Sequence, residues 1–86
     1  MNETFVFDYD GHKVEVQGGK HITLYMNGVR IAQSKKITNP DKAIDCTTSE
    51  GDHFVVRYIG GDFGGSELCL LLINNKVYYP TEIHQV

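Results

Sequence analysis

Two turn dipeptides, Asp10-Gly11 and Asn27-Gly28, constrain this chain more than any other feature. Each dipeptide lies between runs in which apolar and polar residues alternate. A type I′ hairpin turn requires positive φ at both central positions, which Asp, Asn and Gly tolerate. A two-residue loop at 10–11 pairs Phe7 with Val14, so apolar residues meet on one face. The sequence therefore predicts antiparallel hairpins at both dipeptides.

The same test extends the hairpins into a meander. A two-residue loop at 27–28 pairs Leu24 with Ile31, and a three-residue loop at 18–20 pairs Val16 with Ile22. A two-residue loop at 18–19 would instead bury polar side chains, so we expect a bulge-type loop there. Residues 4–34 are therefore predicted to form a four-stranded meander. Its expected inner face consists of Phe5, Phe7, Val14, Val16, Ile22, Leu24, Met26, Val29 and Ile31.

A second apolar block begins near His53 and ends before Pro80. An odd-numbered loop around 60–66 places Phe54, Val56 and Tyr58 opposite Leu72, Leu70 and Leu68, and a two-residue loop at 74–75 pairs Leu72 with Val77. We expect a three-stranded meander here. The intervening residues 35–52 are interpreted as a crossover with at most a short helical turn starting at Asn39-Pro40.

Each meander has one apolar face, so neither is stable alone. The predicted fold is a single all-β domain over residues 1–86, a small antiparallel β-sandwich or flattened barrel. Alanine, the best helix former, occurs only at Ala32 and Ala43, which argues against a helical bundle.

The predicted outer face of the second meander is also apolar, and a strand that is apolar on both faces is normally buried on both. We expect an interface there, formed by Val55, Ile59, Cys69, Leu71, Ile73 and Tyr78. Two alternatives remain for what covers this face. The crossover could fold over this face with Ile37, Ala43 and Ile44, or a second chain could cover it. The three crossover residues are few for six positions, which favours an interface, most simply a two-fold homodimer.

No motif points to catalysis, a metal or a cofactor. The four histidines His12, His21, His53 and His84 do not converge in the predicted registers, and no serine lies in a nucleophile motif. A net charge of −3 argues against nucleic-acid binding, and no apolar run reaches the ~20 residues of a membrane span. The N-terminal residues do not resemble a secretory signal, so we expect a cytoplasmic protein. Cys46 and Cys69 are expected to be reduced, although a bridge between them stays open.

The glycine-rich loop 60–65 is a candidate partner-binding loop, with Asp62 and Phe63 at its tip. Together with this loop, acidic residues that are predicted in loops could bind a basic partner surface. These residues are Asp45, Glu50, Asp52, Asp62 and Glu67. The expected function is a non-catalytic protein-interaction module of the accessory or inhibitor type. The alternative is a module that binds a small ligand or carbohydrate by stacking on Tyr25, Tyr78 or Phe63.

Overall fold

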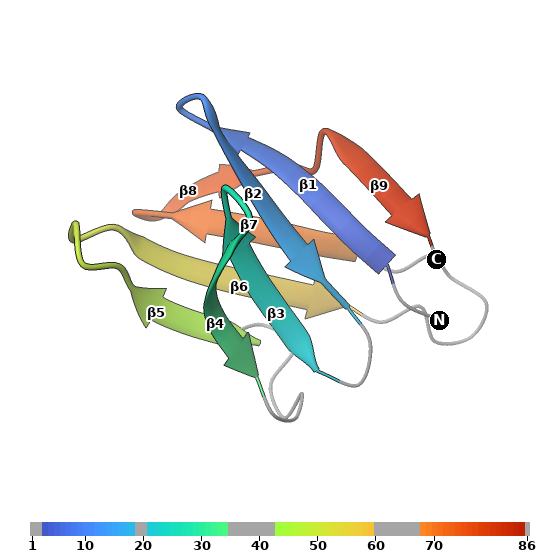
Figure 1. Ribbon diagram of the computed structural model, residues 1–86, viewed down its shortest axis with the longest axis horizontal. Coiled ribbons are helices and arrows are strands. Elements are labelled where there is room, and N and C mark those ends of the chain that lie inside the picture. Colours follow the sequence, from blue (N-terminus) through green and yellow to red (C-terminus); the bar gives the residue numbers. More distant parts are fainter. Residues whose placement is uncertain (1–2, 19–20, 35–42, 60–67, 86) are drawn as a thin grey trace.

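The fold is all-β, with two antiparallel sheets that face each other in a computed structural model of the protein (Figure 1). The structure describes residues 3–18, 21–34, 43–59 and 68–85, and no helix occurs among them. The first sheet has the order β4-β3-β2-β1-β9 and the second β5-β6-β7-β8. The strands of the first sheet are β1 (Glu3–Tyr9), β2 (His12–Gln17), β3 (Ile22–Met26), β4 (Val29–Ser34) and β9 (Glu82–Gln85). Those of the second are β5 (Ile44–Thr47), β6 (His53–Ile59), β7 (Leu68–Ile73) and β8 (Lys76–Tyr78).

The hairpin between β1 and β2 has the predicted register. Phe7 pairs with Val14 and Phe5 with Val16, and the turn residue Asp10 has a φ of 50°. The turn between β3 and β4 likewise has Asn27 at a φ of 51°. The meander pairing of the first four strands is therefore confirmed, because the turn chemistry and the hydrophobic alternation specify the same register.

Two details of this meander differ from the prediction. Val16 pairs with Leu24 and Gln17 with Thr23, so the loop between the last paired residues has five residues instead of the predicted three. The loop is still odd-numbered, which keeps the same side chains on the inner face. Gly18 lies at its start, where an added Cβ would overlap the Tyr58 hydroxyl of the opposite sheet. This position therefore has room only for glycine.

The second difference is a β-bulge between Leu24 and Tyr25. Leu24 consequently pairs with Ala32, and the predicted pairing with Ile31 is wrong. Val29 at the start of β4 is 64% exposed, so its predicted place on the inner face is also wrong. A bulge adds a residue to one strand, and hydrophobic alternation alone does not locate it.

Two strands were not predicted, so the predicted four-plus-three arrangement is in fact five plus four. β5 arises in the predicted crossover and pairs with β6, which places Ile44 in the core. Ile44 therefore does not cover the outer face of the second sheet. The predicted helical turn at 39–40 and the proposed cover by Ile37 lie outside the described residues.

β9 returns the chain to the first sheet after Pro80. The backbone N–H of Thr81 donates to the Val6 carbonyl at 2.7 Å, which begins the pairing of β9 with β1. Four-residue strands such as β5 and β9 carry too little alternation to identify from sequence.

The register of β6 and β7 corrects the most consequential prediction. Phe54 pairs with Ile73 and Val56 with Leu71, one residue away from the predicted pairing. The connecting segment 60–67 is therefore even-numbered, because Ile59 pairs with Leu68. A one-residue change reverses every side chain of a strand. Cys69, Leu71 and Ile73 consequently face the core, where each is at most 1% exposed.

The core lies between the two sheets and draws on both. Phe5, Phe7 and Val16 of the first sheet are fully buried against the second-sheet residues Phe54 and Leu71. The rings of Phe5 and Tyr58 pack edge to face, with a centroid distance of 5.8 Å and an interplanar angle of 86°. Edge-to-face contact of this kind adds to the free energy gained from burial alone. The aromatic contacts therefore join the two layers.

The same asparagine contact occurs in both sheets. The side-chain oxygen of Asn27 accepts a hydrogen bond of 3.0 Å from the backbone N–H of Lys13. The backbone N–H of Asn27 in turn donates to the backbone carbonyl of Lys13 at 2.8 Å. Asn74 makes the equivalent pair of bonds with His53, at 2.9 and 2.8 Å. Each asparagine thus ties a hairpin turn to the first residues of the neighbouring strand. The side-chain amide of Asn74 also donates to Asp52 at 3.0 Å.

The register of β7 predicts different costs for truncating two adjacent leucines. Leu71→Ala removes a fully buried side chain and should lower the free energy of unfolding by about 2–5 kcal/mol. Leu72→Ala removes a half-buried side chain on the other face and should cost about 1 kcal/mol or less. Chemical denaturation of the two variants measures the difference, and a larger cost at Leu72 would contradict the register.

The turn at 74–75 provides a second, matched test. Asn74→Gly keeps a residue that tolerates positive φ but removes the side-chain bonds to His53 and Asp52, so we expect a loss of about 1–3 kcal/mol. Asn75→Gly leaves those bonds in place and suits the φ of 68° at this position. It should be neutral or stabilising. Equal thermal denaturation midpoints for the two variants would exclude the asparagine contact as a stabilising element.

Candidate interaction surfaces

An outer apolar face covers the middle of the second sheet, on the side opposite the core. We use this name for the five aliphatic residues Val55, Leu68, Leu70, Leu72 and Val77. Leu72 lies at the centre, paired with Val55 on one side and Val77 on the other. Leu68 and Val77 are 41% and 44% exposed, and the other three are half-buried. β7 is thus apolar on both faces, as predicted, but with the two sets of residues exchanged.

The predicted interface residues fall in several places. Val55 lies on the outer apolar face, and Ile59 ends β6, paired with Leu68. Three others are core residues, so their predicted exposure on the outer face is wrong: Cys69, Leu71 and Ile73. Tyr78 pairs with Leu71 and packs against the core, so it also leaves the predicted face. Asp62 and Phe63 of the predicted partner-binding loop lie outside the described residues.

Charged groups border the outer apolar face on its β5 and β6 side. Arg57 pairs with Leu70 within the face. Asp45, which was predicted in a loop, lies in β5 opposite Val55, and its carboxylate forms a hydrogen bond with Nε2 of His53. Both partners of this pair are about two-fifths exposed, so its contribution to stability is small. Among the described residues, the face therefore combines the cation Arg57 and the anion Asp45 with an aliphatic centre.

An aromatic cluster closes one end of the sandwich. The Tyr9 ring contacts Phe54 at a centroid distance of 6.0 Å and Tyr78 at 5.6 Å, both edge to face. The pKa of the Tyr9 hydroxyl is raised because the group is partly desolvated and lies near the carboxylates of Asp52 and Asp10. This end of the molecule therefore has a negative local potential.

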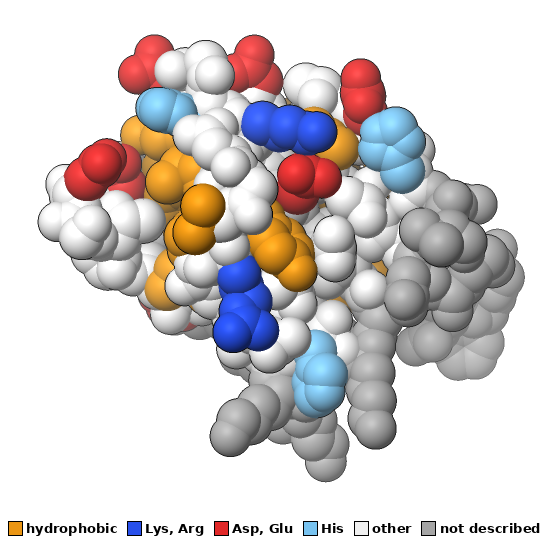
Figure 2. All heavy atoms as spheres, in the orientation of Figure 1, with side chains coloured by type: hydrophobic (Ala, Val, Ile, Leu, Met, Phe, Trp, Pro, Cys, Tyr) orange, Lys and Arg blue, Asp and Glu red, His pale blue; other side chains and the backbone are white. Residues whose placement is uncertain are grey.

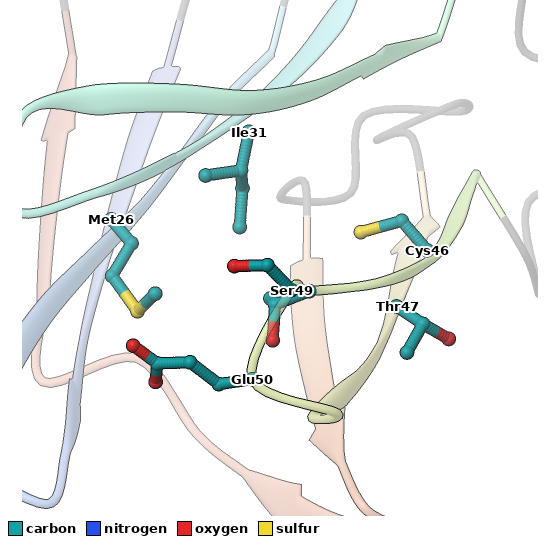
Figure 3. Close-up of a pocket in the computed structure, with 7 residues that line it drawn as sticks. Met26, Ile31, Cys46, Thr47, Ser49 and Glu50 are labelled. Atoms are coloured by element: carbon teal, nitrogen blue, oxygen red, sulfur yellow. The ribbon is translucent and has the colours of Figure 1, made fainter.

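A cleft of about 300 Å³ opens between the sheets at their β4–β5 side. In Figure 3, the side chains of Met26, Ile31 and Cys46 converge on it, and the Ser49 hydroxyl points into it. The Glu50 carboxylate lies beside the Met26 thioether at the rim. Figure 2 shows hydrophobic side chains exposed over this region, with acidic side chains next to them. Because β5 was not predicted, the cleft could not be found from sequence.

The histidines occupy separate places on the surface. His12 contacts the Asn27 amide at 3.0 Å, His53 contacts Asp45, and His84 contacts Glu82 at 2.9 Å. His21 is exposed at the start of β3. Within the described residues, no three His, Cys, Asp or Glu side chains are grouped so that they could hold a metal ion.

The aromatic residues suggested as carbohydrate platforms do not form one surface. Tyr25 is half-buried in the first sheet, next to Glu15 and Arg30. Tyr78 is packed against Tyr9, with the Lys76 amine 5.5 Å from the ring centroid. Phe63 lies outside the described residues.

Both cysteines are free thiols on the inner side of the second sheet. They lie on β5 and β7 with β6 between them, which puts them beyond the reach of a disulfide. Burial raises the pKa of the Cys69 thiol to about 12. Burial, and then the neighbouring Asp45 carboxylate, raise the pKa of Cys46.

The buried Cys69 thiol predicts a loss of stability at alkaline pH. In the unfolded chain the thiol loses its proton near pH 8.5, whereas in the folded protein it keeps the proton up to about pH 12. The unfolded state therefore binds fewer protons between these values, and the free energy of unfolding should fall by up to about 1.4 kcal/mol per pH unit.

The matched variant is Cys69→Ala, which should show a shallower decline over the same pH range in chemical denaturation. Tyr9 and Cys46 titrate in both proteins, so the difference in slope isolates Cys69. Identical slopes would show that the thiol does not keep its proton through burial.

Among the described residues, none belongs to a helix that could cross a membrane. No protein-family model matches the chain, and searches of curated proteins and of solved structures give no significant match.

Proposed function

We propose that this protein is a non-catalytic protein-interaction module that associates with a second copy of itself through the outer apolar face. The observation that carries the proposal is the chemistry of β7. Its inward residues fill the core, and its outward residues Leu68, Leu70 and Leu72 are equally apolar. A sheet face exposed only to water normally alternates with polar residues. Leu70 and Leu72 therefore favour a surface that is covered in the functional state.

The charges on this face support a second copy as the partner. The whole chain carries a net charge of −3, so two copies repel each other weakly at long range. The outer apolar face, in contrast, combines the cation Arg57 with the anion Asp45. A two-fold contact places the same patch on both partners, and a patch with both signs avoids like-charge repulsion.

The size of the sheet predicts a weak dimer. Four strands spaced about 4.8 Å apart, with a mean length of about five residues, present about 320 Å² of flat area per copy. Two such areas total about 640 Å², below the 1,200–2,000 Å² typical of stable complexes. We therefore expect a reversible dimer whose population rises with protein concentration. Tyr79, which is 71% exposed next to β8, is placed to extend the contact.

Sedimentation velocity over a range of concentrations tests the dimer. Leu72→Glu adds a charge at the centre of the outer apolar face and should abolish the concentration-dependent rise in sedimentation coefficient. Circular dichroism should remain native, because Leu72 lies outside the core.

The matched control is Val29→Glu, which places the same charge on an exposed aliphatic residue of the other sheet. It should dimerise like the unmodified protein. A strictly monomeric unmodified protein at high concentration, or equal behaviour of the two variants, would contradict the proposal.

A further inference from the structure

The β4–β5 side of the sandwich is open among the residues that the structure describes. β4 is the last strand of the first sheet and β5 the first strand of the second, and the two lie side by side (Figure 1). The cleft between them has an aliphatic and sulfur-containing floor of Met26, Ile31 and Cys46. All three pack against the core while keeping exposed surface. At about 300 Å³, the cleft has room for one aliphatic side chain and part of a backbone.

A second hollow of about 230 Å³ continues from the cleft toward the end of the sandwich. The two hollows share Met26 and Glu50, so together they form one groove. The second hollow is polar, and it is also lined by Tyr9, Asp10, His12, Asn27 and Asp52. The groove is therefore apolar at one end and lined by three carboxylates at the other.

The three carboxylates have different roles in the folded chain. Asp52 accepts a hydrogen bond from Asn74, so it is held in place by the fold. Asp10 and Glu50 are exposed, and among the described residues no cation lies within ion-pair distance of either. Desolvation raises the pKa of Tyr9, and the nearby carboxylates of Asp52 and Asp10 raise it further. This end of the groove is complementary to a positive charge.

The backbone of β5 adds a third element. The Thr48 N–H donates to the Asp52 carbonyl at 2.8 Å, so Thr48 is a hydrogen-bonded position of the β5–β6 ladder. Because such positions alternate, the N–H and C=O of Thr47 point toward the open edge. The Thr47 side chain points away from the cleft in Figure 3, which leaves its backbone next to the groove. An exposed edge of this kind can pair with an extended peptide.

We propose that the groove binds an extended segment of a partner protein in which an aliphatic residue lies next to lysine or arginine. The aliphatic side chain enters the cleft over Met26 and Ile31, the cationic side chain reaches Glu50 and Asp10, and the segment's backbone bonds to the edge of β5. The groove lies on a different side of the molecule from the outer apolar face. The proposal therefore goes beyond self-association and does not depend on it.

The test uses three short acetylated and amidated peptides titrated into the ¹⁵N-labelled full chain and followed by NMR. Gly-Lys-Leu-Lys-Gly carries both features, Gly-Lys-Ser-Lys-Gly lacks the aliphatic side chain, and Gly-Glu-Leu-Glu-Gly reverses the charge. We expect the first peptide to bind most tightly and to shift the amide signals of Met26, Ile31 and residues 46–50. Equal binding of all three peptides, or shifts located elsewhere, would overturn the proposal.

Substitutions distinguish the groove from general charge attraction. Glu50→Gln should weaken binding of the first peptide about twofold to fivefold, the effect of removing one exposed charge pair. Glu82→Gln makes the same charge change on β9, at the opposite edge of the first sheet, and should leave the affinity unchanged. Equal losses in the two variants would show attraction to net charge alone.

Two further measurements complete the test. Leu72→Glu should bind the peptide normally, which separates this result from the fate of the dimer. Cadaverine, an alkyl diamine without a peptide backbone, should bind more weakly than the peptide. A tighter complex with cadaverine would mean that the groove holds a small amine and would overturn the assignment to a protein segment.

Discussion

The pairing of Phe54 with Ile73 decides which side of β7 enters the core, and the rest of the second sheet depends on it. Side chains alternate along a strand, so this single pairing directs Leu71 inward and Leu70 and Leu72 outward. The inward set meets Phe5, Phe7 and the other buried residues of the first sheet. The outward set forms the face through which we propose that the protein associates. Stability and interaction thus depend on the same register.

The turns at one end of the sandwich hold this arrangement together. Asn27 and Asn74 each tie a hairpin to a neighbouring strand, and Tyr9 joins the sheets by contacting Phe54 and Tyr78. At the β4–β5 side, the edge strands of the two sheets lie side by side without pairing. The groove thus lies between strands that do not pair with each other, next to turns held by hydrogen bonds and aromatic contacts. Its walls are held in place by the core. Such a surface can bind a partner without rearrangement of the backbone.

The first sheet was largely predictable because two independent signals agree there. Asp10-Gly11 determines the turn, and the alternation around Phe7 and Val14 determines the face. The second sheet lacks this agreement, because residues 68–73 are apolar at every position and suit either register equally. Loop length alone then decides the pairing, and a Gly-rich segment carries no signal for its parity.

The candidate sites were likewise predictable only in part. The apolar character of both faces of β7 was predictable, but the side to which Cys69 and Leu71 belong was not. The groove depends on β5, whose four residues Ile44–Thr47 alternate between apolar and polar but are too few to identify a strand from sequence. Its lining combines Met26 with Glu50, which are distant in sequence, so only the tertiary arrangement reveals it.

The central claim is that Leu70 and Leu72 form an interface while Leu71 belongs to the core. Methyl NMR with a soluble paramagnetic relaxation agent tests it directly when repeated across protein concentrations. We predict that the Leu71 methyl signals are protected at every concentration. Those of Leu70 and Leu72 should be attenuated in dilute solution and become protected as the concentration rises. Attenuation of Leu71, or attenuation of Leu70 and Leu72 that does not change with concentration, would contradict the account.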